Sequence, residues 1–178
     1  MNSSTQSILL CLGLILIVAN IAQADKKCAL AIKVCDGTFK ERARCMEIVR
    51  SNPKIQSAKN PVQISKFVLE LAIHKAVAGQ KFLKNLAKKS KSPAIQQCAG
   101  FDYDGVVGSF KSALGEIKED PMTANYDAKV AGDGPDNCDR GLAAEKIVNP
   151  AITKLNDEIR LMSVIAYVAT DLIPYKEP

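Results

Sequence analysis

The stretch from Pro150 to Ile173, PAITKLNDEIRLMSVIAYVATDLI, repeats apolar side chains at alternating steps of three and four residues. This spacing puts them on one face of an α-helix, because about 3.6 residues complete a turn. Pro150 suits a first helical turn, where its missing N–H needs no partner, and Pro174 ends the run. The stretch therefore predicts a long helix with one buried stripe, formed by Ile152, Leu155, Ile159, Met162, Ala166, Ala169 and Ile173.

Three upstream segments follow the same helical period. One begins at Asn60-Pro61 and ends in the lysine-rich residues 88–93, with the stripe Ile64, Val68, Ala72, Ala76, Gly79, Leu83 and Leu86. The next runs from about 93 to 118, with the stripe Ala99, Tyr103, Val106, Phe110, Ala113 and Ile117. The last covers residues 121–130 and stops at the helix breakers Gly132-Asp133-Gly134-Pro135.

Four glycines weaken the helix predicted over residues 93–118, since each costs about 1 kcal/mol relative to alanine in a helix interior. Close approach of a neighbouring helix would explain them. These glycines are Gly100, Gly105, Gly108 and Gly115.

Four amphipathic helices with short connections predict an all-α fold, an antiparallel up-and-down four-helix bundle over residues 60–174. No stretch alternates apolar and polar residues as a half-buried strand does. Before Asn60, the segments Cys28–Cys35 and Thr38–Ser51 predict two short helices joined near Asp36-Gly37. We therefore expect residues 25–59 to form an N-terminal α-helical hairpin appended to the bundle.

Residues 1–24 have the features of a cleavable signal peptide. They contain no charged side chain, include a long aliphatic run and end in Ala22-Gln23-Ala24, a small-x-small pattern directly before Asp25. The rival interpretation is a membrane anchor, but the run is too short to cross the roughly 30 Å hydrocarbon core as a helix. We expect a secreted product, residues 25–178, that forms one domain and has no membrane association after cleavage.

The charge of the chain is unevenly distributed. Residues 25–100 contain sixteen basic and five acidic side chains, whereas residues 101–178 contain eight basic and fourteen acidic ones. In a secreted protein a basic half indicates polyanionic glycans or acidic protein surfaces as partners, and we expect no nucleic acid partner. The alternative is that these lysines are only the solvated end of a helix, where they complement its dipole: Lys81, Lys84, Lys88, Lys89 and Lys91.

Cleavage of the signal peptide would remove Cys11 and leave an odd number of cysteines. Disulfides are the default in an oxidising compartment, so one thiol is free or pairs with another molecule. The sequence favours neither a zinc site nor any cofactor, since it has no Cys-x-x-Cys and a single histidine, His74. The five remaining cysteines are Cys28, Cys35, Cys45, Cys98 and Cys138.

The residues do not assemble into a catalytic pattern. A histidine-dependent triad would rest entirely on His74, which lies inside a predicted helix. The acidic residues of the loop before the last helix do not follow the order of a calcium loop. We expect a protein that is not an enzyme and that acts by presenting a surface.

The cysteine framework resembles that of the plant pectin methylesterase inhibitor and invertase inhibitor family. The matching features are Cys35-x-x-Thr38, Cys45, Cys98, Cys138-Asp139-x-x-Leu142 and the last helix. The resemblance implies a four-helix bundle with an N-terminal hairpin and two disulfides, Cys35–Cys45 and Cys98–Cys138, the second joining the third helix to the loop before the last one. Cys28 is then the leftover cysteine, either a free thiol or a competitor of Cys35 for Cys45.

The chain departs from the family pattern at two places. Nine residues rather than eight separate Cys35 from Cys45, and the usual proline between them is missing. The tyrosine expected four positions after the third cysteine is replaced by Asp102, and Tyr103 follows, as if one residue were inserted.

The resemblance implies an inhibitor that covers the active-site cleft of a plant carbohydrate-active enzyme in the cell wall, one inhibitor per enzyme. Pectin methylesterase is the first expected target, and cell-wall or vacuolar invertase is the alternative. Invertase inhibitors have Pro-Lys-Phe where this chain has Pro121-Met122-Thr123. A third alternative is a non-inhibitory, pectin-binding or allergen-like member.

The expected target interface follows from the same resemblance. The helix after the third cysteine provides much of the contact in methylesterase inhibitors, and the Pro-Lys-Phe position does so in invertase inhibitors. Tyr103 also lies on an apolar stripe, so a place in the core is an equal alternative for it. The expected interface residues are Asp102, Tyr103, Asp104, Lys111, Met122 and Thr123.

Overall fold

The computed structural model describes residues 29–174, and every regular element in that range is a helix. The all-α prediction is therefore confirmed for this part of the chain. Its helices include none that is both long enough and apolar enough to cross a membrane. The predicted signal peptide, residues 1–24, and the predicted free thiol, Cys28, lie outside the described residues.

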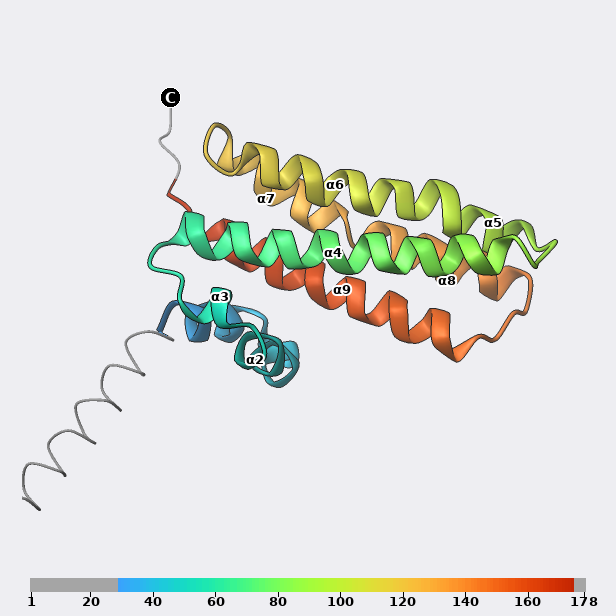
Figure 1. Cartoon of the computed structure of the whole chain (residues 1–178), viewed down its shortest axis with the longest axis horizontal. Coiled ribbons are helices and arrows are strands. Elements are labelled where there is room, and N and C mark those ends of the chain that lie inside the picture. Colours follow the sequence, from blue (N-terminus) through green and yellow to red (C-terminus); the bar gives the residue numbers. More distant parts are fainter. Residues whose placement is uncertain (1–28, 175–178) are drawn as a thin grey trace, which may run out of the picture.

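Four long helical segments lie side by side and form the body of the molecule (Figure 1). In chain order they are α4 (Pro61–Ala87); α5 (Pro93–Gln97) continued by η2 (Cys98–Asp102) and α6 (Tyr103–Glu116); α7 (Pro121–Val130) followed by α8 (Asp133–Ala144); and α9 (Pro150–Asp171). The colours of Figure 1 show that the chain direction alternates from each segment to the next. α4 packs on α6 and α9, and α7 packs on the same two helices, so each segment contacts its neighbours in sequence and the first contacts the last.

Each of the four segments begins with a capping residue followed by proline. The side chains of Asn60, Ser92, Asp120 and Asn149 accept hydrogen bonds from backbone N–H groups of the first turn. The proline that follows each cap occupies the first helical position, where no N–H donor is needed. The sequence thus fixes all four starting points locally, as expected for Asn60 and Pro150.

The predicted stripes make up much of the core. Apart from Leu86 and Leu155, which are partly buried, every residue of the three long stripes is buried. Small side chains such as Ala72, Ala76, Ala166 and Ala169 occupy central positions, and this allows the helix axes to approach closely.

One helix was not expected. The breaker cluster at 132–135 was predicted to end the fourth helix, but the chain breaks only at residues 131–132 and continues as α8. Pro135 is the third residue of α8, in the turn whose N–H groups lack intrahelical partners, so it is tolerated there. As a consequence Cys138 lies within a helix and not in a loop.

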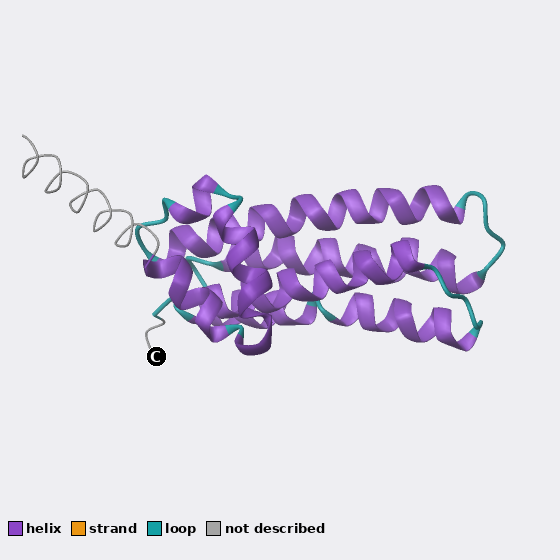
Figure 2. Ribbon diagram, turned by 90° about the horizontal axis from the view of Figure 1, so that it is seen from below, coloured by secondary structure: helices purple, strands orange, loops and turns teal. Residues whose placement is uncertain are grey.

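The hairpin lies at the end of the bundle where α9 ends (Figure 2). It comprises a helical segment over residues 29–37, η1 (Phe39–Glu41), α2 (Arg42–Arg50) and α3 (Pro53–Gln56). The Cys35–Cys45 disulfide joins its two arms, with 5.4 Å between the Cα atoms. Phe39, one of the nine residues between these cysteines, is exposed and adopts a left-handed φ of 49°.

The explanation offered for the glycines of the third segment is wrong. A Cβ atom added at Gly100, Gly105, Gly108 or Gly115 would have no neighbouring atom within 4 Å, so no helix approaches them closely. The close approaches occur instead at other glycines. A Cβ on Gly79 would lie 2.5 Å from Leu155, and one on Gly134 would lie 2.6 Å from the backbone oxygen of Asp102.

Candidate functional site

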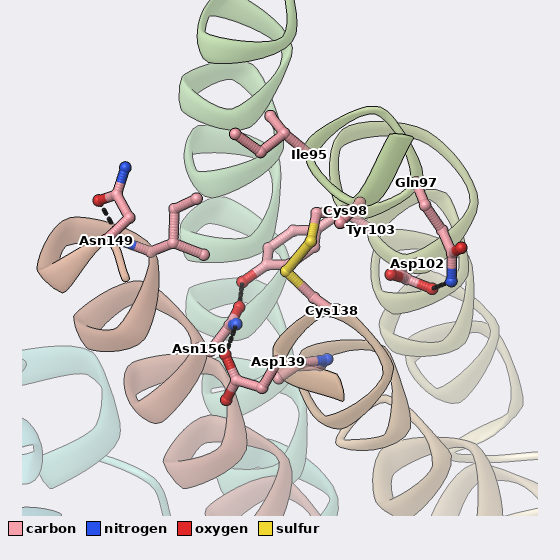
Figure 3. Close-up of a disulfide and its surroundings, with 12 residues drawn as sticks. Ile95, Gln97, Cys98, Asp102, Tyr103, Cys138, Asp139, Asn149 and Asn156 are labelled. Atoms are coloured by element: carbon pink, nitrogen blue, oxygen red, sulfur yellow. Dashed lines mark hydrogen bonds between the residues drawn. A yellow bond between two sulfur atoms is a disulfide. The ribbon is translucent and has the colours of Figure 1, made fainter. Parts of the chain in front are cut away.

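A disulfide braces the start of the α6 segment against α8. Cys98 at the start of η2 is bonded to Cys138 in α8, with 4.8 Å between the Cα atoms, and both side chains are fully buried (Figure 3). Asp102 lies close enough to both sulfurs to complete a three-residue cluster. The sulfurs are bonded to each other, however, so neither offers a thiolate to a metal ion.

A buried polar chain joins α6, α9 and α8 beside this disulfide. The Tyr103 hydroxyl donates to Asn156 Oδ1 at 2.7 Å, and Asn156 Nδ2 donates to Asp139 Oδ1 at 2.6 Å (Figure 3). Arg160 pairs with the other oxygen of Asp139. Burial raises the pKa of the Tyr103 phenol, so the ring stays neutral and keeps its donor. These hydrogen bonds fix the three helices α6, α8 and α9 relative to one another.

Asp102 is drawn into the interior by a π-helical turn. η2 spans Cys98–Asp102 as a π-helix, which accommodates one residue more than an α-helical turn. Only 2% of Asp102 is exposed, one of its oxygens accepts from Gln97 Nε2 at 3.4 Å, and the other has no partner. Burial raises the pKa of this carboxyl above its ordinary value, against the opposing effects of Gln97 and Arg140.

A shallow groove of about 370 Å³ opens on the outer side of the same region. One wall comes from η2 and α6 and the other from α7 and α8, which approach closely because Gly134 has no side chain. Phe101 stands at the rim with 79% of its surface exposed. The remaining lining residues are Asp102, Asp104, Gly105, Val106, Ser109, Val130, Asp133 and Asn137.

Four of the six expected interface residues are exposed on the α6–α7 face, the outer surface of these two helices. Asp104 lies beside the groove, 3.5 Å from Lys84 of α4, and Lys111 follows two turns later on the same side of α6. Met122, 62% exposed, and Thr123 lie in the first turn of α7. The Thr123 hydroxyl donates to the capping residue Asp120 at 2.7 Å, and the hydrogen bonds from Thr123 lower the pKa of that carboxyl.

The other two expected interface residues require a correction. Tyr103 has no exposed surface and Asp102 almost none, so neither side chain can contact a partner directly. For Tyr103 the alternative place in the core is the correct one. For Asp102 the π-helical turn is the physical reason, since it rotates the side chain inward between Cys98 and Val106.

Two exposed aromatic residues on this surface were not among the expected interface residues. Phe101 is 79% exposed and Tyr126 is 66% exposed. Both residues fall outside the apolar stripes of their helices. This position is the feature of the sequence that could have identified them as exposed. An aromatic residue that the helical period places in water is a candidate contact residue.

The family model of plant invertase/pectin methylesterase inhibitors matches residues 29–168. The chain belongs to this family. Its match extends from the hairpin to the last turn of α9, and therefore includes both disulfides and the whole α6–α7 face. A search of curated protein sequences found no match.

Two solved structures of the family have a similar fold. A mutant form of a pectin methylesterase inhibitor from Arabidopsis superposes with a TM-score of 0.69 at 21% identity, covering 80% of this chain and 96% of that one. A pectin methylesterase inhibitor from Arabidopsis thaliana gives a TM-score of 0.60 at 19% identity, covering 76% and 90% respectively. The likeness confirms the fold.

The two departures from the inhibitor family pattern coincide with two local irregularities of the backbone. Phe39, which adopts a positive φ, is one of the nine residues between Cys35 and Cys45. The other departure, Asp102 followed by Tyr103, lies at the end of the π-helical turn, and Tyr103 is buried in the core. Both departures leave the disulfide on either side of them intact.

Proposed function

We propose that this chain is a secreted inhibitor of pectin methylesterase that covers the active-site cleft of the enzyme with its α6–α7 face, one inhibitor per enzyme. It would act in the apoplast, outside the cell, and not by chemistry of its own. Membership of the inhibitor family supports the class of function. The observation that carries the site is the exposed aromatic and charged surface of η2 and α6, held by a buried disulfide and by the hydrogen bonds that link Tyr103, Asn156 and Asp139.

A rigid surface suits an inhibitor that binds without chemistry. Ordering loops and side chains costs free energy on association, and a surface that is already ordered avoids this cost. The start of α6 is fixed to α8 by Cys98–Cys138 and to α9 by Tyr103 and Asn156. Phe101 and Asp104 flank these anchored positions and project outward.

Invertase is the second candidate target, and the first turn of α7 favours the esterase over it. The position that holds lysine and an aromatic ring in invertase inhibitors holds Met122 and Thr123 in this chain. The Thr123 hydroxyl is engaged in the cap of α7. An exposed methionine provides apolar contact but no charge, so an invertase site that recognises a cation would lose that interaction. A vacuolar location would accompany this second target.

The test is inhibition of purified pectin methylesterase and purified invertase isoforms by the oxidised protein, from mildly acidic to neutral pH. Phe101→Ala is expected to weaken inhibition, because it removes an exposed ring from the rim of the groove. Val148→Ala is the matched control, since Val148 is 91% exposed in the connection before α9, outside the α6–α7 face. Absence of inhibition against every isoform, or equal losses in the two variants, would refute the proposal.

A further inference from the structure

The end of α4 and its connection to α5 present a row of exposed lysines. In the part of the chain that the structure describes, no carboxylate lies within 4.0 Å of four of them, whereas Lys84 lies 3.5 Å from Asp104. We call these residues the lysine row: Lys81, Lys84, Lys88, Lys89 and Lys91.

Besides Asp104, the carboxylate of Glu145 lies near the end of this row, next to Lys91 through its contact with Ser92, and it is already engaged. Glu145 accepts hydrogen bonds from the Ser92 hydroxyl and from the Ala94 N–H at 2.8 Å, and so caps α5. These bonds also place the α8–α9 connection beside the lysine row. The next residue of that connection, Lys146, is exposed as well and adds positive charge at this end of the molecule.

The acidic half of the chain does not neutralise the row either. Three aspartates, at 136, 139 and 157, surround Arg160, and Glu158 pairs with Lys75. Much of the negative charge of α8 and α9 is therefore paired with Lys75 of α4 and Arg160 of α9, and not with the lysine row. The positive field at the end of α4 remains directed to solvent.

Helix stability alone does not account for the row. Lysines complement the helix dipole only within the last turn, where Lys84 and Lys88 lie. Lys81 is a further turn inside α4, and Lys91 lies beyond the end of the helix. Lys81, Lys84 and Lys88 share one helix face and extend over about 10 Å at a rise of roughly 1.5 Å per residue.

We propose that the lysine row binds the free carboxylates of pectin, a linear polyuronate. A row of separate ammonium groups on a convex helix suits a linear chain with one carboxylate per sugar better than a compact anion. The choice of polymer rests on the proposed function, because a pectin methylesterase converts methyl esters of pectin into carboxylates. The inhibitor would then be held on the polymer where esterase has acted, by a surface other than the α6–α7 face.

Binding to polygalacturonate, measured by co-sedimentation of the oxidised protein over a range of salt concentrations, tests this proposal without the enzyme. Replacing Lys81, Lys88, Lys89 and Lys91 by glutamine should weaken binding at low ionic strength by at least about tenfold and flatten its salt dependence, since fewer counterions are released. The matched control carries the same loss of charge at exposed lysines elsewhere, namely Lys40, Lys54, Lys59 and Lys154. Fully methyl-esterified pectin, which lacks the carboxylates, should not sediment the protein.

Four outcomes would overturn the proposal. They are no binding of wild-type protein to polygalacturonate, equal losses in the two quadruple variants, equal binding to the esterified polymer, and retention on nucleic acid in preference to polygalacturonate. Inhibition of the esterase is measured separately on the same variants. Binding to polygalacturonate without inhibition of the esterase supports the lysine row as a pectin-binding surface and refutes only the proposed inhibitor. Inhibition without binding supports the proposed inhibitor and refutes only the lysine row.

Discussion

Two Gly→Ala substitutions on facing parts of the bundle should change stability in opposite directions. A Cβ at Gly134 would lie 2.6 Å from the backbone oxygen of Asp102 and 2.4 Å from Val106 Cγ2. A backbone oxygen cannot rotate out of this contact as a side chain can. The added Cβ would therefore force α8 to move away from η2. Overpacking of this kind costs about 1–3 kcal/mol. Gly134→Ala should therefore lower the melting temperature by roughly 2–12 °C in a domain of about 150 residues.

Gly108→Ala is the matched substitution in open space. Gly108 lies inside α6, and a Cβ there meets nothing within 4 Å. Alanine reduces the backbone entropy of the unfolded chain, so this variant should gain about 0.4–1 kcal/mol in free energy of unfolding. Both variants can be compared by chemical denaturation and thermal scans of the oxidised protein. A neutral or stabilising Gly134→Ala would refute the close approach, and a destabilising Gly108→Ala would refute the exposure of this face.

Three further substitutions test the interior around α6. Tyr103→Phe leaves the buried Asn156 oxygen without its donor and should cost about 1–3 kcal/mol in urea denaturation. Replacing Cys98 and Cys138 by alanine opens a loop of sequence separation 40 and should cost about 3.9 kcal/mol by the loop-entropy relation, detected in the same assay as a lower midpoint. Burial raises the pKa of Asp102 in the folded protein above its pKa in the unfolded chain. Burying this carboxyl therefore costs no stability at a pH below the unfolded pKa, where both states are protonated. The cost develops as the pH rises from the unfolded pKa through the folded pKa. Asp102→Asn should therefore raise stability at neutral pH and remove the decline in stability that the wild type shows between the unfolded and the folded pKa of Asp102, and an unchanged pH profile would contradict this.

The helices and their buried faces could be predicted from the sequence because both signals are local. A capping residue before proline fixes each start, and the period of the apolar residues fixes the buried side. The disulfide pairs, by contrast, followed only from the family resemblance. Odd numbers of cysteines and their spacings leave several pairings open, and the fold decides among them.

The unpredicted features depend on contacts between distant segments. α8 continues through Gly134 and Pro135 because these residues fall in a first turn and because a side chain at 134 would collide with η2. The inward position of Asp102 depends on the π-helical turn, and the predicted apolar stripe, which passes through Tyr103, does not include Asp102. A clue existed nonetheless, since Asp102 lies four residues from each of two buried residues, Cys98 and Val106.

The exposed glycines of α6 support its proposed role as a contact surface. Each of Gly105, Gly108 and Gly115 costs about 1 kcal/mol of helix stability, and no packing contact inside the bundle requires their small size. Their absent side chains leave the α6 backbone open to close approach by another molecule, beside the exposed ring of Phe101. Proteins commonly give up stability at sites where function constrains the sequence. We therefore expect Gly105→Ala and Gly108→Ala to stabilise the fold while weakening inhibition, a combination that a merely structural role for these positions would not produce.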